Sequence, residues 1–242
     1  MLKIENYELP SLEQWRIIIE GMRNPMNSWA GMDSECGCEY GKCEDGNDSY
    51  CYLWNECHGS IAEYIIGDND YALMKKLAKA GSVHAKYRRM IPVFVTLTAP
   101  LYWWKEFDTY KVGTVANSCS TMHKIQAKEF TIGDFSHEHL FDFKEAHERM
   151  LFFSPPKEVL AQTITTLNFC REMFLKTKDK KYWWQMIQLL PSSYNQKRTV
   201  MLSYEVLANM YYWRKDHKLD EWHTFCDWIK GLPYSELITG GE

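Results

Sequence analysis

The chain has 242 residues, an ordinary charged fraction of 25% and a net charge of −4, so we expect no nucleic-acid polymer as a partner. Aromatic residues are frequent, at 15%, and such side chains build ligand pockets and subunit interfaces as well as cores. There is no apolar run long enough to cross a membrane, and the first ten residues, MLKIENYELP, lack the apolar core of a signal peptide. We therefore predict a cytoplasmic protein with no membrane partner, whose eight cysteines are thiols or metal ligands rather than disulfides.

The N-terminal part is predicted to be a short strand followed by a helix. Residues 1–9 fit a strand, and Ser11 is placed to cap a helix whose apolar residues recur at helical spacing. Gly21 and Pro25 are expected to end this helix. Residues 24–60 are polar, rich in glycine and not periodic, which indicates a long loop or insertion. The chain is read as one domain, 1–242, with this Cys-rich insertion at about 30–60.

The centre of the chain combines an apolar strand with an aromatic helix and a polar loop. A helix from about Asp70 to Gly81 comes first. Ile91–Thr98 is predicted to be a buried strand, ended by Ala99-Pro100 because proline cannot donate to a ladder. An aromatic helix, Leu101–Phe107, and a polar loop, Gly113–Ser120, complete an arrangement suited to presenting polar groups at a cleft.

The C-terminal half is predicted to be mostly helical, so the fold class is a helix-rich α+β domain with a small sheet. Its expected elements are a helix starting at Asp134 or Ser136 and reaching Phe153, a helix from Lys157 to Thr177, an aromatic helix from Tyr182 to Leu190, a strand at Thr199–Leu202, and helices at Tyr204–Lys215 and Leu219–Lys230.

Three groups of polar side chains are candidates for ligand binding. Serine, asparagine and lysine side chains of the polar loop can form hydrogen bonds with a ligand or contact a phosphate, and the basic residues just before the buried strand can contact a phosphate. Turn formation, a solvated strand entry and a surface ion pair of Arg214 with Asp216 or Glu205 are the structural alternatives. The candidates are Lys111, Asn117, Ser118, Ser120 and His123, then His84 with Arg88 and Arg89, then Arg214 and His217.

The Cys-rich insertion carries six soft or borderline metal ligands within 23 residues. They are Cys36, Cys38, Cys43, Cys51, Cys57 and His58. Such a loop, without an apolar core of its own, can fold around zinc, although the paired C-x2-C spacing typical of zinc sites is missing. A flexible thiol-bearing loop and adventitious disulfides remain the alternatives.

The order of several short features resembles the flavin-dependent thymidylate synthases. The features are a helix ending at Gly81, then His84, the strand closed by Ala99-Pro100, the aromatic helix, Asn117 and Ser120, then Leu190-Pro191, Tyr194, Asn209, Arg214 and His217. This resemblance covers residues 70–230 and implies FAD as cofactor and a pyrimidine nucleotide as substrate. It also implies a homo-oligomer, a tetramer, with the site formed between subunits.

The resemblance further assigns candidate roles to individual residues. It implies flavin contacts for His84, Arg89, Asn117, Asn209 and His217, and nucleotide contacts for Lys111, Ser118, Ser120 and Arg214.

Several cationic positions of the family pattern hold other residues in this chain. They fall on Tyr110-Lys111-Val112, Met122, Ile187 and Glu205. We therefore predict a flavin-dependent enzyme with an altered substrate site, or a non-catalytic nucleotide- or protein-binding module that keeps the fold. The sequence assigns no catalytic residue.

Overall fold

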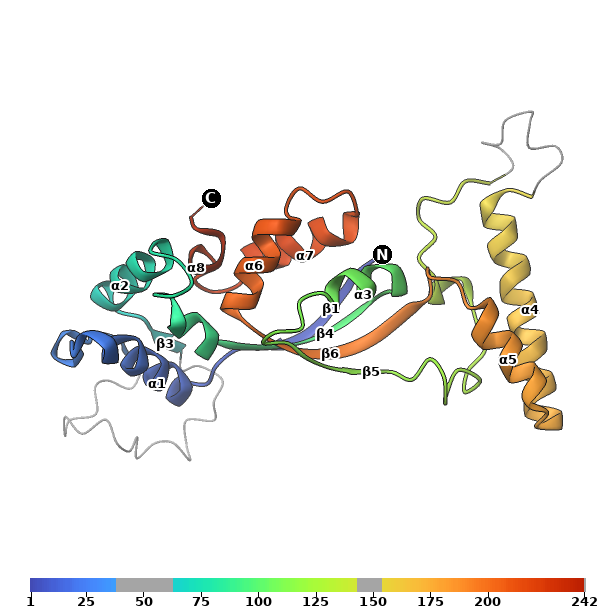
Figure 1. Ribbon diagram of the computed structural model, residues 1–242, viewed down its shortest axis with the longest axis horizontal. Coiled ribbons are helices and arrows are strands. Elements are labelled where there is room, and N and C mark those ends of the chain that lie inside the picture. Colours follow the sequence, from blue (N-terminus) through green and yellow to red (C-terminus); the bar gives the residue numbers. More distant parts are fainter. Residues whose placement is uncertain (38–62, 143–153, 242) are drawn as a thin grey trace.

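A four-stranded antiparallel sheet forms the centre of the molecule, with helices gathered mainly on one of its faces (Figure 1). The computed structural model describes residues 1–37, 63–142 and 154–241. The strand order is β1-β4-β6-β5, and the strands are β1 (Lys3–Glu8), β4 (Pro92–Pro100), β6 (Asn195–Ser203) and β5 (Val115–Ser118). A second, two-stranded sheet pairs β2 (Glu35–Gly37) with β3 (Glu63–Ile65) at the two ends of the predicted insertion.

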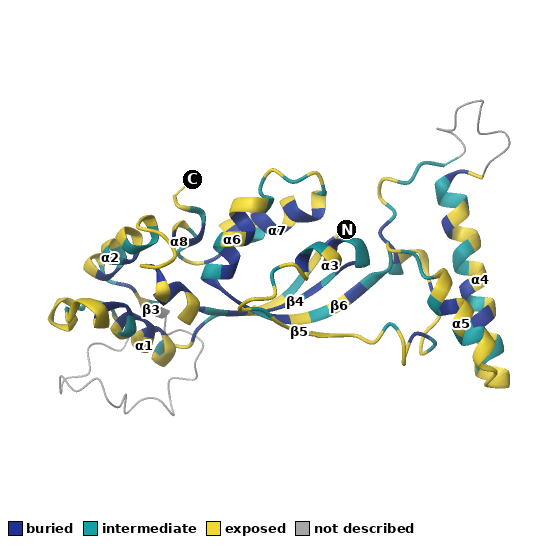
Figure 2. Ribbon diagram, viewed as in Figure 1, coloured by how far each residue is buried: buried dark blue, intermediate teal, exposed yellow. Residues whose placement is uncertain are grey.

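The central pair β4–β6 fixes the geometry of the sheet. All nine residues of β4 pair with β6, from Pro92 opposite Ser203 to Pro100 opposite Asn195. Alternate residues of β4 are buried, whereas Phe94 on the opposite face is exposed (Figure 2). The predicted strand is therefore confirmed, but Ala99-Pro100 closes it as its last two residues. Helix α3 (Leu101–Phe107) follows at once and buries Trp103, Trp104 and Phe107 in the main core.

The helices near the N-terminus follow the predicted pattern. Helix α1 (Leu12–Arg23) begins with a capping box, in which Ser11 and Gln14 bond to each other's backbone. Gly21 lies inside this helix, which continues to Arg23. Helix α2 spans Asp68–Lys79, and Gly81 follows it with a positive φ of 98°. Short 3₁₀ helices link these elements: η1 (Asn24–Met26), η2 (Trp29–Gly31), η3 (Lys86–Met90) and η4 (Ile132–Asp134).

The C-terminal helices include a pair that lies beyond one end of the sheet. They are α4 (Pro156–Thr177), α5 (Lys180–Leu189), α6 (Tyr204–Arg214), α7 (Asp220–Lys230) and α8 (Glu236–Thr239). Helices α6, α7 and α8 pack on the main core, whereas α4 and α5 build a second apolar cluster with Ile125, Phe130 and Phe135. Figure 1 shows this pair at the far end from α1 and α2. The division of the chain into domains stays a prediction.

Two sequence-based expectations about elements were wrong in their described parts. The polar loop Gly113–Ser120 contains strand β5, whose four exposed residues pair with the free edge of β6. Because all four residues of β5 are exposed and two apolar residues are followed by two polar ones, the strand has no apolar alternation in its sequence. The helix expected from Asp134 or Ser136 is not formed over residues 135–142, because Asp134 instead bonds back to Thr131 and ends η4. Residues 143–153 lie outside the described part.

Across the described ranges, none of the helices combines the length and apolar character that spanning a bilayer requires.

Candidate functional site

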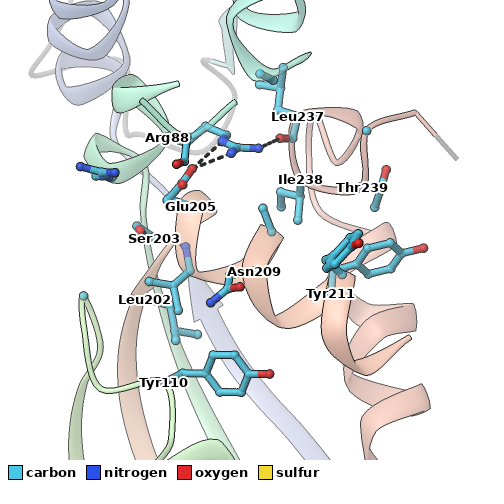
Figure 3. Close-up of a pocket in the computed structure, with 18 of the residues that line it drawn as sticks. Arg88, Tyr110, Leu202, Ser203, Glu205, Asn209, Tyr211, Leu237, Ile238 and Thr239 are labelled. Carbon is cyan, nitrogen blue, oxygen red and sulfur yellow. Dashed lines mark hydrogen bonds and ion pairs between the residues drawn. The ribbon is translucent and has the colours of Figure 1, made fainter. Parts of the chain in front are cut away.

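A large cavity lies where α2, η3, α6, α8 and the loop after α3 come together. Its volume is about 1430 Å³, above the roughly 300–1,000 Å³ typical of small-molecule sites. Figure 3 shows α6 at its centre, with Glu205 and Asn209 on that helix, Arg88 on η3 and Tyr110 in the loop after α3. The cavity is therefore large enough for a dinucleotide, or for a nucleotide beside a second flat ligand.

Basic side chains dominate the charge of the cavity. Lys79, Arg89 and Lys111 all line it and are exposed, and within the described residues none of them forms an ion pair or a side-chain hydrogen bond. Arg88 is different, because its guanidinium is paired with Glu205. Three unpaired cations on one cavity make a site that attracts anionic ligands such as phosphates.

Flat aromatic surfaces and a free amide complete the lining. Tyr212 and Trp213 are 68% and 66% exposed, and both border the cavity at the C-terminal half of α6. The side chain of Asn209 has no partner among the described residues and lies one turn earlier on the same helix. Exposed rings beside an unpaired amide are suited to stacking on a heterocycle and bonding its edge.

The structure brings only part of the predicted site together. Arg89, Lys111 and Asn209 line one cavity. Arg88, also a candidate, lines the same cavity, whereas the other candidates are not part of its lining; they are His84, Asn117, Ser118, Ser120, His123, Arg214 and His217.

The polar residues of β5 and the turn after it have structural roles. Asn117 pairs with Thr199 and Ser118 with Arg198 in the sheet, and the Ser120 hydroxyl accepts the backbone N–H groups of Met122 and His123. This is the turn chemistry given above as the alternative for the serines. A role of these residues in ligand binding stays a prediction.

Arg214 and His217 converge on a carboxylate rather than on the cavity. Arg214 Nη1 lies 3.0 Å from Glu106 Oε2, and His217 Nε2 lies 3.2 Å from the same oxygen. The Arg214 guanidinium also donates from Nε to the Tyr110 hydroxyl and stacks 4.9 Å from the Trp222 ring centre. The proposed alternative partners, Asp216 and Glu205, were wrong, because Glu106 comes from α3 through the tertiary structure.

Sequence reasoning missed two features of the cavity. Lys79 was not singled out, although its place in the last turn of α2 beside Gly81 is visible in the sequence. The ion pair between Arg88 and Glu205 joins positions 117 residues apart, so no local sequence pattern predicts it.

A metal site has no support from the described side chains. Within residues 1–37, 63–142 and 154–241, no three His, Cys, Asp or Glu residues are grouped as metal ligands. Cys38, Cys43, Cys51, Cys57 and His58 lie outside the described residues, so zinc in the insertion stays a prediction.

The loop that carries Lys111 into the cavity depends on a glycine. Gly113 has a φ of +80°, and a Cβ there would lie 3.0 Å from Val206 Cγ2. We expect Gly113→Ala to lower the free energy of unfolding by more than the roughly 1–2 kcal/mol typical of a left-handed alanine. Gly81→Ala is the matched control, since φ is +98° there and nothing lies within 4 Å of the added methyl. Equal losses in urea unfolding would mean that the contact with Val206 is easily relieved.

The sheet order and the helices gathered on one of its faces define an α+β fold with a basic, aromatic cavity. No protein-family model matches the chain, and no curated protein sequence matches it. Solved structures do match, and over nearly its whole length.

Thymidylate synthase X from Helicobacter pylori, crystallised with FAD and dUMP, is similar over 99% of this chain and 97% of its own, with 13% identity and a TM-score of 0.57. The UMP/dUMP methylase PolB from Streptomyces cacaoi, bound with 5-Br dUMP, is similar over 99% of this chain and 94% of its own. Its identity is 12% and its TM-score is 0.53. The chain therefore has the fold of the flavin-dependent thymidylate synthases, as its sequence predicted.

Proposed function

We propose that the protein is a flavin-dependent enzyme that modifies a pyrimidine nucleotide, with the ligands bound in the cavity beside α6. The observation that carries this proposal is the lining of that cavity: three unpaired cations, a free amide and exposed aromatic rings occur together in a space of about 1430 Å³. Proteins of the same fold are crystallised with FAD and dUMP, which supports the same ligand classes here.

The residues present fit a flavin nucleotide over most of the cavity. Tyr212 and Trp213 offer flat surfaces for a ring system, Asn209 offers an amide for its polar edge, and Arg89 and Lys111 offer charge for phosphates. When bound, a flavin supplies hydride transfer, and the protein supplies orientation and electrostatics. The chain's own contribution is to hold the nucleotide against that surface.

A non-catalytic nucleotide-binding module is the second candidate function. It is favoured by the placement of Arg214 and His217, which are committed to Glu106 instead of lining the cavity. Two candidate ligand-binding residues of the resembling pattern therefore contact Glu106 and do not line the cavity.

Flavin content separates the two functions. We expect the purified protein to be yellow, with flavin absorbance that remains through gel filtration, and to bind dUMP in isothermal titration calorimetry. Binding of dUMP without flavin, before or after incubation with FAD, would favour the binding module. Loss of both would remove the proposed site.

The cations of the cavity are expected to contribute to binding of anionic ligands. Arg89→Ala and Lys111→Ala should each weaken dUMP or FAD binding about tenfold, corresponding to about 1.4 kcal/mol for a charge-assisted contact. Lys105→Ala is the matched control, because Lys105 is equally exposed but lies on α3 outside the lining. Calorimetric affinities that are the same for all three variants would contradict a phosphate role for Arg89 and Lys111.

A further inference from the structure

The cavity contains a carboxylate with one oxygen left free. Arg88 Nε and Nη2 lie 2.8 Å and 2.6 Å from the same atom, Oε2 of Glu205, and Arg88 Nη1 donates to the carbonyl of Leu237 at 3.0 Å (Figure 3). The two charged side chains are only 11% and 18% exposed. Within the described part of the chain, Oε1 of Glu205 has no hydrogen-bond partner.

An acceptor in this position requires a donor from outside the protein. Carboxylate oxygens that are largely removed from water are almost always hydrogen-bonded, and Glu205 can only accept. Because Glu205 lines the cavity, the donor comes from water or from a bound ligand. The contact with Arg88 also fixes the side chain, so its free oxygen is held in one place before a ligand arrives.

The surroundings of Glu205 favour the nucleoside part of a ligand over a phosphate. The charge of Arg88 is compensated by Glu205, so this pair itself has no net positive charge to offer an anion. Asn209 follows Glu205 by four residues, and positions four apart on a helix are neighbours about 5–6 Å apart. The Glu205 oxygen can accept a hydrogen bond, and the Asn209 amide beside it can donate one. Together they match a heterocycle edge or a sugar on which a hydrogen-bond donor lies next to an acceptor.

We propose that Glu205 determines ligand specificity: its Oε1 accepts a hydrogen bond from a base N–H or sugar O–H of the pyrimidine nucleotide, and its negative charge disfavours a phosphate at this carboxylate. The phosphate then lies toward cations that have no carboxylate partner, such as Lys111. This inference rests on the proposed function, because it names how the same cavity orients the nucleotide.

The variant Glu205→Gln tests the acceptor directly. In this variant the N–H groups of Arg88 still bond to the oxygen of the glutamine amide, so its NH₂ group takes the place of Oε1 and faces the cavity. The hydrogen-bond acceptor at that position is thereby replaced by a donor. We expect dUMP binding to weaken at least about tenfold, the usual scale of one mismatched charge-assisted bond. Binding of inorganic pyrophosphate should strengthen, since a negative charge has been removed.

Glu236→Gln is the matched control for charge alone. Glu236 also lines the cavity, but one of its oxygens is bonded to the Tyr71 hydroxyl and it is exposed. It should change dUMP affinity by less than about threefold, as expected of a screened surface charge. Equal dUMP affinity in the parent and Glu205→Gln, or tighter dUMP binding by Glu205→Gln, would overturn the proposed role of Glu205.

Ligand analogues test the same contact on the unaltered protein, independently of how the variants fold. N3-methyl-dUMP lacks the base N–H, and the 2′,3′-dideoxy analogue lacks the sugar hydroxyl. We expect one of them to bind the parent protein at least about tenfold more weakly than dUMP, which identifies the donor. If both bind as tightly as dUMP, Glu205 accepts from neither and the inference fails while the proposed function stands. If dUMP itself does not bind the parent, the proposed function fails and this inference falls with it.

Discussion

Asp70→Ala is expected to lower the free energy of unfolding by about 3–5 kcal/mol, the range for removing one partner of a buried ion pair. Asp70 is fully buried, and its Oδ1 lies 2.5 Å from Nε of the buried Arg23. Its Oδ2 accepts the backbone N–H groups of Asp33 and Ser34 at 3.0 Å and the Ser34 hydroxyl at 2.6 Å. Alanine leaves the buried guanidinium of Arg23 without its carboxylate, with only the contacts of Nη1 to Ser28 remaining, and it leaves the donors to Oδ2 without this acceptor.

Asp227→Ala is the control for this result, because Asp227 forms an exposed pair with Lys230 at i,i+3 spacing. It should cost no more than about 0.5 kcal/mol in the same urea titration. A similar small loss for Asp70→Ala would mean that Arg23 finds another partner or becomes solvated.

The pH dependence of stability gives a second reading of Asp70. Burial alone raises the pKa of this carboxyl, but the hydrogen bonds from Ser34, Asp33 and Arg23 outweigh burial and hold the pKa below its usual 3.8. A carboxyl whose pKa is lower in the folded state than in the unfolded state stabilises the fold at every pH above its unfolded-state pKa. This stabilisation is lost as the pH falls through the folded-state pKa. Asp70→Asn should therefore flatten the loss of stability below about pH 3.8 relative to the parent.

The second large effect is expected from Arg214→Ala, at about 2 kcal/mol of unfolding free energy. The variant removes a charge-assisted bond to Glu106, a hydrogen bond to Tyr110 and a stack on Trp222. Arg214→Lys should recover only part of the loss, because an ammonium cannot reproduce the planar fork. A loss below about 0.5 kcal/mol would be that of a surface ion pair, the alternative considered from the sequence.

Arg214 is also expected to influence ligand binding indirectly. Tyr110 lines the cavity, and Arg214 Nε donates to its hydroxyl at 2.9 Å. If Arg214 acts by positioning Tyr110, then Tyr110→Phe and Arg214→Ala should weaken dUMP binding by non-additive amounts in a double-mutant cycle. Additive effects would instead indicate that Arg214 reaches the ligand itself.

Local signals in the sequence determined most of the helices and the central strand. Ser11 caps α1, Pro191 follows α5, and Ser154-Pro155 precedes α4, which begins at Pro156. Each of these signals acts on the backbone within a few residues. The apolar, β-branched run indicated the buried strand β4, and the structure then showed that alternate residues of this strand are buried. The family fold could be predicted because such local signals occur in a characteristic order along the chain.

Only the tertiary structure decided which polar residues share a cavity. Glu205 pairs with Arg88, and Arg214 pairs with Glu106, and in each pair the two residues are more than a hundred positions apart in the chain. The type of a side chain does not tell whether it binds a ligand or pairs with such a distant residue. Strand β5 was missed for a related reason, since its pairing is supplied by the edge of β6 and not by its own exposed residues. Periodicity reports burial within one element, whereas partners for charged groups are set by packing between elements.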